Sequence, residues 1–350
     1  MAALRLAAGL EEAGWSCRGI FLYYRKEMNN VDHTYECLLD RPPRSPGDFI
    51  KIIWRLRGVM RMERPEAVVC FLPLAMVLGS LIAQNCGVRQ RIVSHRVPAD
   101  TYGAMMRWLD ILAAWAGLYT EVVAVSKSVG RSCKPYPRWL KRRIHVVYNG
   151  LKGWRRSDKN QEEARSHFGL TVKGKLIVAV GRLDAQKNYP VLIDAMVTVP
   201  ADVRLAIAGQ GELLDEIIAQ IARLKLQERV TVLGAISRTD VPHLLAAADV
   251  FAQPSLFEGQ SNALLEALAA GLPCIVSDAP EQIETITSNT GEAAGLVLPA
   301  TDPVAWSEGI ASFLSDDGRL ITAKARAKER SEAFTYDKMV NGFAKVVGAD

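Results

Sequence analysis

Residues 249–278, DVFAQPSLFEGQSNALLEALAAGLPCIVSD, decide the fold that we expect for this chain. The apolar run at 249–253 predicts a buried strand, and the segment 262–270 predicts a short helix that Gly271 ends. A second apolar run at 273–277 predicts the next strand. A strand, a helix and a strand in so short a stretch form a unit whose two strands run parallel.

The same alternation extends to both sides of this stretch. In the second half we expect strands and helices in turn, at 176–181, 190–198, 203–208, 211–223, 229–234 and 240–247. In the first half we expect an opening helix, strands at 17–24, 67–71, 91–95, 121–125 and 144–149, and helices at 48–62 and 74–84. The fold class is therefore α/β, with two Rossmann-like doubly wound domains that face a cleft.

The length agrees with two domains, because 350 residues are about twice the usual size of one. We expect domains at 1–150 and 151–334, a hinge in the polar stretch 151–163, and a last helix at about 335–350 that packs back on the first domain. With 49% hydrophobic and 23% charged residues, the composition excludes a disordered chain and a collagen. The six cysteines form no CxxC pair, which argues against a zinc site or a disulfide framework and favours a reducing cytoplasm.

The net charge of +5 is unevenly distributed. Residues 1–150 hold 22 Lys/Arg against 12 Asp/Glu, whereas the remainder holds 21 against 26. A basic half indicates an anionic partner, which is a membrane surface, a nucleic acid or a phosphorylated substrate. A lopsided solvated surface is the alternative interpretation.

The uncharged stretch 67–88 is long enough to span a membrane. Pro73 interrupts it, and Gln84 and Asn85 dilute it, so we interpret it as a buried strand followed by a helix. Glu11 and Glu12 fall where the apolar core of a signal peptide would continue.

In an open α/β sheet, ligands bind beyond the carboxyl ends of the strands. Arg182 and Lys187 follow the strand at 176–181, where two cations can clamp a diphosphate. Glu258 follows the strand at 249–253, and Glu266 lies in the next helix, whose free amides can bind phosphate oxygens. Taken one at a time, these side chains are better interpreted as solvated loop and helix charges.

Two further places follow strands. IAGQGEL at 207–213 has only two glycines of the dinucleotide fingerprint, so a tight strand-to-helix turn is the better interpretation. His95 ends the strand at 91–95, where we expect it to face the cleft, although a lone histidine is more often structural.

Together and in this order, these places resemble the family 4 glycosyltransferases. The blocks VGRLDAQKNYPVLIDAM, LAIAGQGEL, VVAVSKSV, VVYNGL and the stretch from VTVLGAISRTD to CIVSD carry the resemblance, which runs from residue 2 to about 340. It implies the two-domain GT-B fold and transfer of a sugar from a nucleotide-sugar with retention of configuration. Independent loop charges would not fall at all these positions, so the resemblance favours the functional interpretation of each.

The resemblance also implies a role for each matching residue. Arg182 and Lys187 would hold the donor diphosphate, Glu266 the ribose hydroxyls and Glu258 the donor sugar. The remaining expected donor-binding residues are Gly259, Gln260, Ser261 and Asn262 near the phosphate and sugar, and Leu233, Gly234, Ala235 and Ile236 around the base. His95 matches a first-domain histidine near the transferred sugar.

Bond cleavage at the anomeric carbon leaves negative charge on the diphosphate, which fixed cations and helix-end amides stabilise. We therefore expect no metal and no cofactor, and the pair Asp316 and Asp317 lies in a helix-end turn rather than after a strand. The expected donor is UDP- or GDP-linked, and the expected acceptor is a glycan or polyprenyl-linked lipid of cell-envelope or exopolysaccharide synthesis. The expected location is cytoplasmic, at the inner membrane face, where the basic first domain contacts anionic lipid and no nucleic acid is bound.

The chain departs from the family at its start, where a first strand and a glycine-rich loop are lacking before MAALRLAAGLEEAGW. We interpret this as a true start upstream of Met1. Two alternatives stay open: a nucleotide-sugar epimerase of the same fold, and a truncated non-catalytic protein that binds nucleotide-sugar or membrane. A dehydrogenase is disfavoured because the full glycine fingerprint is lacking.

Overall fold

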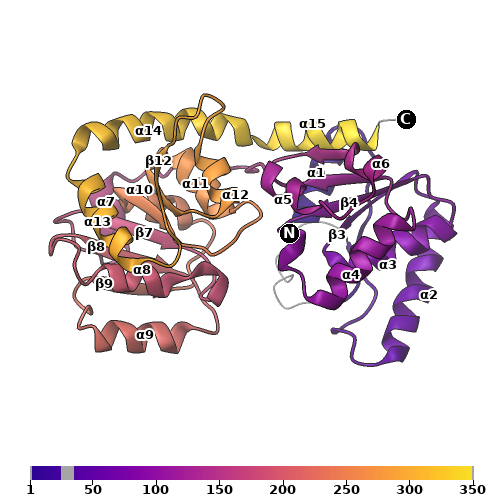
Figure 1. Cartoon of the computed structure of the whole chain (residues 1–350), viewed down its shortest axis with the longest axis horizontal. Helices are drawn as coiled ribbons and strands as arrows, with labels where there is room; N and C mark the ends of the chain where they lie inside the picture. Colours follow the sequence, from indigo (N-terminus) through magenta and orange to yellow (C-terminus); the bar gives the residue numbers. More distant parts are fainter. Residues whose placement is uncertain (1, 25–34, 349–350) are drawn as a thin grey trace. The chain divides into compact units, whose positions relative to one another are not determined.

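The computed structural model describes residues 2–24 and 35–348 and divides into two compact units (Figure 1). Unit 1 comprises residues 1–152 and 336–350, and unit 2 comprises residues 153–335. The helix at the end of the chain belongs to unit 1, where its Tyr336 hydroxyl donates to the backbone oxygen of Arg5 over 2.6 Å. Met1 and the last two residues, 349–350, lie outside the described residues.

Within the described residues, unit 2 is built on a six-stranded sheet of order β12-β11-β10-β7-β8-β9, with every neighbouring pair parallel. The strands are β7 (Leu176–Val180), β8 (Arg204–Ala208), β9 (Val230–Gly234), β10 (Val250–Gln253), β11 (Cys274–Ser277) and β12 (Gly295–Leu298). β10 and β11 are buried along their whole length, as near-continuous apolar runs in a parallel sheet require.

Helices cover both faces of this sheet (Figure 1). One layer joins α8 to α9 and α13, and the other joins α10 to α7 and α11. The helices are α7 (Gln161–His167), α8 (Tyr189–Ala195), α9 (Leu214–Arg223), α10 (Val241–Ala247), α11 (Asn262–Ala270), α12 (Pro280–Ile286), α13 (Pro303–Leu314) and α14 (Asp317–Ser331). The largest side chain of the core between sheet and helices is the fully buried Trp306 of α13.

The strand order of unit 2 reverses at β7. From there the chain builds β8 and β9 to one side and β10, β11 and β12 to the other. The helices that follow β7 and β10 therefore leave the sheet on opposite sides, and the carboxyl ends of these two strands mark the switch point at which doubly wound sheets bind ligands.

Unit 1 has its described strands in two sheets, β1-β2 and β3-β4-β5-β6, all parallel. They are β1 (Gly19–Phe21), β2 (Tyr35–Cys37), β3 (Ala67–Phe71), β4 (Gln90–His95), β5 (Glu121–Ala124) and β6 (Ile144–Val146). Among the described strands, β1 pairs with β2 alone and β3 pairs with β4 alone. The described strands of unit 1 thus form two separate sheets, and the interpretation that a first strand is lacking stays a prediction.

Two groups of helices belong to unit 1. α3 lies between α2 and α4, and α1 packs on α15 in a core that includes Leu10 and Phe343. The helices are α1 (Ala2–Glu12), α2 (Pro46–Glu63), α3 (Pro73–Asn85), α4 (Ala104–Trp115), α5 (Lys127–Ser132), α6 (Arg138–Lys141) and α15 (Tyr336–Val347). The uncharged stretch 67–88 forms β3 and α3, and none of the helices in the described part of the chain is long and apolar enough to cross a membrane.

Candidate active site

The N-terminus of α11 lies at the carboxyl end of β10, and its sequence explains why the helix begins there. The Ser261 hydroxyl caps the helix by accepting from the Leu264 amide over 3.4 Å, and it donates to Gln253 Oε1 over 2.7 Å. Gly271 ends the helix with φ +79°, a conformation that glycine adopts without strain. The α11 amides therefore begin just beyond the strand end, and they present a partial positive charge there.

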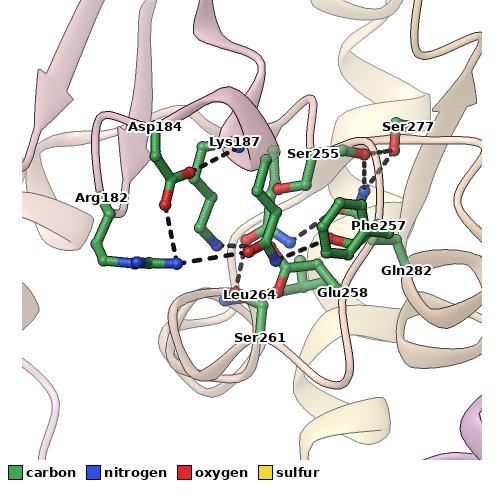
Figure 2. Close-up of polar contacts among 12 residues, drawn as sticks. Arg182, Asp184, Lys187, Ser255, Phe257, Glu258, Ser261, Leu264, Ser277 and Gln282 are labelled. Atoms are coloured by element: carbon green, nitrogen blue, oxygen red, sulfur yellow. Dashed lines mark hydrogen bonds and ion pairs between the residues drawn. The ribbon is translucent and has the colours of Figure 1, made fainter. Parts of the chain in front are cut away.

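The loop between β10 and α11 holds Glu258 against Lys187 (Figure 2). The Lys187 ammonium lies 2.6 Å from Glu258 Oε1, and only 12% and 9% of the two side chains are exposed. The two residues are 71 positions apart in the sequence. Lys187 follows β7 and Glu258 follows β10, so the two strands at which the order reverses each contribute one member of a buried ion pair. A buried cation that has a single carboxylate to balance it is also able to bind an incoming anion.

Three hydrogen bonds hold the two strand-end loops together. The Leu256 amide donates to the Gln186 backbone oxygen over 2.9 Å, and the Gln186 side chain donates to the Phe257 oxygen over 3.0 Å. Asn188 donates to the Pro254 oxygen over 3.1 Å. These bonds fix the approach of Lys187 to Glu258, and sequence reasoning did not identify the residues that make them.

Arg182 lies on the same loop but is 72% exposed. Its guanidinium pairs with Asp184 over 2.8 Å, and Asp184 also accepts from the Lys187 amide over 3.2 Å (Figure 2). Asp184 thus orients both cations, a role missed by the sequence analysis. Its position as a capping aspartate three residues before Lys187 is the sequence signal that could have identified it.

The remaining residues expected around the phosphate and sugar lie at the start of α11. Gly259, Gln260 and Ser261 are buried, and Glu266 is partly buried within the helix. The Asn262 Oδ1 atom is buried and, among the described residues, has no hydrogen-bond donor. A buried acceptor without a donor at a helix N-terminus is suited to a ligand hydroxyl.

The residues expected around the base lie at the end of β9. Leu233, Gly234 and Ile236 are partly exposed and Ala235 is exposed, and Gly234 has φ +68°. The Gly234 oxygen accepts from the Gly209 amide over 2.7 Å, which joins the two neighbouring strand ends.

The glycines of IAGQGEL are explained by packing. A Cβ atom on Gly209 would lie 1.8 Å from the Gly181 oxygen, and one on Gly211 would lie 2.2 Å from the Leu183 oxygen. This loop therefore lies directly against the loop that carries Arg182, and the tight-turn interpretation from the sequence agrees with this geometry.

His95 lies at the end of β4 in unit 1 and is fully buried. Its Nδ1 is 3.0 Å from the Tyr102 hydroxyl, and its Nε2 is 2.8 Å from the Tyr136 hydroxyl. Tyr136 donates to the buried Asp110 carboxylate over 2.6 Å, and Tyr119 donates to the other oxygen of Asp110 over 3.0 Å. The ring is thus enclosed by its own unit rather than turned to an open face, and a place near the transferred sugar stays a prediction.

The electrostatics of this cluster favour an uncharged imidazole and uncharged tyrosines. Burial lowers the pKa of His95 below its usual value, and Asp110 opposes that shift. Burial, and next the Asp110 charge, raise the pKa of Tyr136 well above its usual value. No sequence signal points to the cluster, since its members lie on β4, α4 and three loops.

The comparisons with known proteins agree with the site in unit 2. Residues 160–333 match the model of the family described as glycosyl transferases group 1. A Campylobacter jejuni protein is 30% identical over 205 residues, which are 58% of this chain and 53% of that protein. It is named N-acetylgalactosamine-N,N'-diacetylbacillosaminyl-diphospho-undecaprenol 4-alpha-N-acetylgalactosaminyltransferase.

An Escherichia coli protein named UDP-Gal:alpha-D-GlcNAc-diphosphoundecaprenol alpha-1,3-galactosyltransferase is 28% identical over 246 residues. These cover 65% of this chain and 62% of that protein. The chain therefore aligns with little more than half of the length of the curated relatives.

Solved structures confirm the α/β fold of both units. HepE of Anabaena in complex with UDP-glucose has a TM-score of 0.85 at 18% identity, covering 99% of this chain and 94% of its own. WaaG, a glycosyltransferase involved in lipopolysaccharide biosynthesis, has a TM-score of 0.72 at 16% identity and covers 99% and 95%. Through the domain at residues 160–333, the chain belongs to the glycosyl transferases group 1 family.

Proposed function

We propose that this protein transfers a sugar, with retention of configuration, from a UDP- or GDP-linked donor to a polyprenyl-linked or glycan acceptor of cell-envelope or exopolysaccharide synthesis. The observation that carries the proposal is the buried pair of Lys187 and Glu258 beside the N-terminus of α11. The pair places a cation for the diphosphate and a hydrogen-bond acceptor for sugar hydroxyls side by side, where the strand order of unit 2 reverses between β7 and β10.

The chemistry follows from where charge develops. As the anomeric C–O bond breaks, negative charge grows on the leaving diphosphate, and Lys187, Arg182 and the α11 amides stabilise it. Glu258 accepts hydrogen bonds from hydroxyls of the donor sugar and holds its anomeric carbon in place. Glu266 binds the ribose diol, and residues 233–236 receive the base. In this scheme neither a metal nor another cofactor supplies the neutralising charge.

The acceptor half of the proposal rests on the relatives and on charge. The names of the two relatives place undecaprenol-linked sugars among their substrates. The excess of cations in residues 1–150 suits an acceptor that is anchored in an anionic membrane. We therefore propose that residues 1–150 bind the acceptor at the inner face of the cell membrane and that residues 151–334 bind the donor.

The test is binding and turnover of nucleotide-sugars by the purified full chain. Isothermal titration with UDP- and GDP-linked sugars identifies the base and the sugar together, and a polyprenyl-diphosphate-sugar acceptor then gives the transfer rate. Donor turnover to an isomeric nucleotide-sugar without any acceptor contradicts transfer and indicates an epimerase. Absence of binding to every nucleotide-sugar refutes the donor site.

A further inference from the structure

The amphipathic order of α4 is reversed. The face of this helix that packs on the fold presents Asp110, Ala113 and Ala114. Four large apolar side chains face solvent instead, with exposed fractions of 73% for Met105, 74% for Trp108, 54% for Leu112 and 63% for Trp115. They follow one another at intervals of three or four residues and therefore form one stripe along the helix.

The reversal has a physical cause in the core of unit 1. The buried side of α4 carries Asp110, whose two oxygens accept the hydroxyls of Tyr136 and Tyr119. That network fixes the rotation of the helix about its axis. Of the large apolar side chains of α4, Met106 and Ile111 are partly buried, whereas those of the stripe stay exposed. The exposed stripe is thus built into the fold and needs an apolar environment outside it.

A basic segment lies beside the stripe. Residues 131–143, RSCKPYPRWLKRR, hold six Lys/Arg and no acid, and all six are exposed. The segment is fixed to the C-terminal half of α4, because the Trp115 indole donates to the Pro135 oxygen over 3.1 Å and Tyr136 bonds Asp110 over 2.6 Å. Trp139 of this segment is itself 43% exposed.

We propose that the α4 stripe and residues 131–143 together form the surface through which the protein docks on a bilayer with anionic headgroups. Tryptophan is the side chain enriched at the headgroup level of membranes, and a helix with one exposed apolar face lies in that plane. The cations beside the stripe are attracted by the negative surface potential of an anionic bilayer. A protein partner with a surface of mixed charge would not supply that potential. The inference rests on the proposed function only in taking a membrane-anchored acceptor as the reason to dock.

Cosedimentation of the full chain with vesicles tests this surface. We expect at least tenfold stronger partition into phosphatidylcholine vesicles with 30% phosphatidylglycerol than into phosphatidylcholine alone, and loss of that difference in about 0.5 M NaCl, where charges are screened within a few Å. The double variant Met105→Ser/Trp108→Ser should bind at least tenfold more weakly, because it removes apolar contact area. The matched control is Val304→Ser/Ile321→Ser, whose side chains are 63% and 68% exposed on unit 2.

Charge reversal tests the other half of the surface. Lys134→Glu/Arg138→Glu should weaken binding to the anionic vesicles at least 25-fold, because each lost cation contributes about a factor of five or more. Binding to phosphatidylcholine vesicles should stay unchanged. The control is Lys173→Glu/Lys324→Glu on unit 2. Anionic vesicle binding that neither test variant weakens overturns the inference. So does a dimer of the wild-type chain that Met105→Ser/Trp108→Ser converts to a monomer, because the stripe then contacts a second copy.

Nucleotide-sugar binding, measured on the same variants, separates this inference from the proposed function. We expect the α4 and 131–143 variants to bind the donor as the wild type does, because their substitutions lie in unit 1. A wild-type chain that binds the donor but no vesicle refutes the docking surface alone. A chain that binds anionic vesicles through α4 but no donor refutes the proposed function alone.

Discussion

Replacing Lys187 by methionine separates the structural role of this side chain from its proposed role in catalysis. The substitution keeps an unbranched side chain of nearly the same length and removes the charge, so Glu258, with 9% of its side chain exposed, loses the cation 2.6 Å away. Removing one partner of a buried pair costs about 3–5 kcal/mol, because the other charge is left without compensation. At 2–4 °C per kcal/mol for a unit of this size, we expect unit 2 to melt roughly 6–20 °C lower.

The double variant Lys187→Met/Glu258→Gln removes both charges at once. Replacing both members of a buried pair by uncharged groups of similar volume is often close to neutral, so we expect most of the lost stability to return. Sugar transfer should not return. A cation about 4 Å from the diphosphate, at an effective dielectric constant near 20, stabilises the transition state by about 4 kcal/mol, which corresponds to about 10³ in rate.

Thermal unfolding and kcat/KM of wild type, both single variants and the double variant complete this cycle, with the exposed Lys173→Met as control. Stability losses that add in the double variant would show that the two side chains do not depend on each other. Unchanged transfer by Lys187→Met, with the control behaving like wild type, would refute the diphosphate clamp.

Four further predictions follow from the structure. Glu266→Ala should weaken the binding of donor and of free nucleotide by about 10- to 100-fold while kcat changes less, since a carboxylate bonded to hydroxyls contributes about 1.5–3 kcal/mol. A variant with the same nucleotide Kd as the wild type would exclude ribose recognition by Glu266. Burial lowers the pKa of His95 below its unfolded value of about 6.5, so the unfolded chain binds more protons and unit 1 should lose stability as pH falls from 7 to 5. In melting curves, the stability of His95→Gln should depend less on pH over that range than the stability of the wild type. The same pH dependence in both proteins would assign the loss of stability to other groups. Gly211→Ala places a Cβ atom 2.2 Å from the Leu183 oxygen and should cost about 1–3 kcal/mol in urea unfolding. Gly58→Ala, inside α2 with open space around it, should instead stabilise unit 1 slightly, because alanine is the better helix former. Finally, EDTA should leave the transfer rate of the dialysed enzyme unchanged, and a loss restored by Mg²⁺ or Mn²⁺ would show that a metal takes part.

Local signals explain why much of the fold could be predicted. The helix expected at 262–270 is α11 with the same bounds, because Ser261 caps its start and Gly271 its end. The strand expected at 67–71 is β3, a continuous apolar run before Pro73. Where a boundary was wrong, a contact from elsewhere decided it: the helix expected from residue 211 begins at Leu214, because Gly211 lies against the backbone of Leu183.

The candidate site was predicted in its residues but not in their contacts. Lys187 and Glu258 were assigned to a diphosphate and a sugar, whereas the structure pairs them with each other. Asp184 was missed although its partners Arg182 and Lys187 lie in its own loop. Gln186 was missed because its partners, Leu256 and Phe257, lie in the other loop. Those partners are brought near only when β7 and β10 become neighbours.

The sequence by itself determined the alternation of strands and helices, the two-unit organisation and the residues at each strand end, because hydrophobic period, caps and glycines act over a few residues. Only the tertiary structure decided that His95 is enclosed by tyrosines, that Lys187 is buried against Glu258, and that α4 turns its tryptophans outward. The reason is that burial and pairing depend on which strand ends and helix faces meet in space, and residues far apart in the chain settle that together.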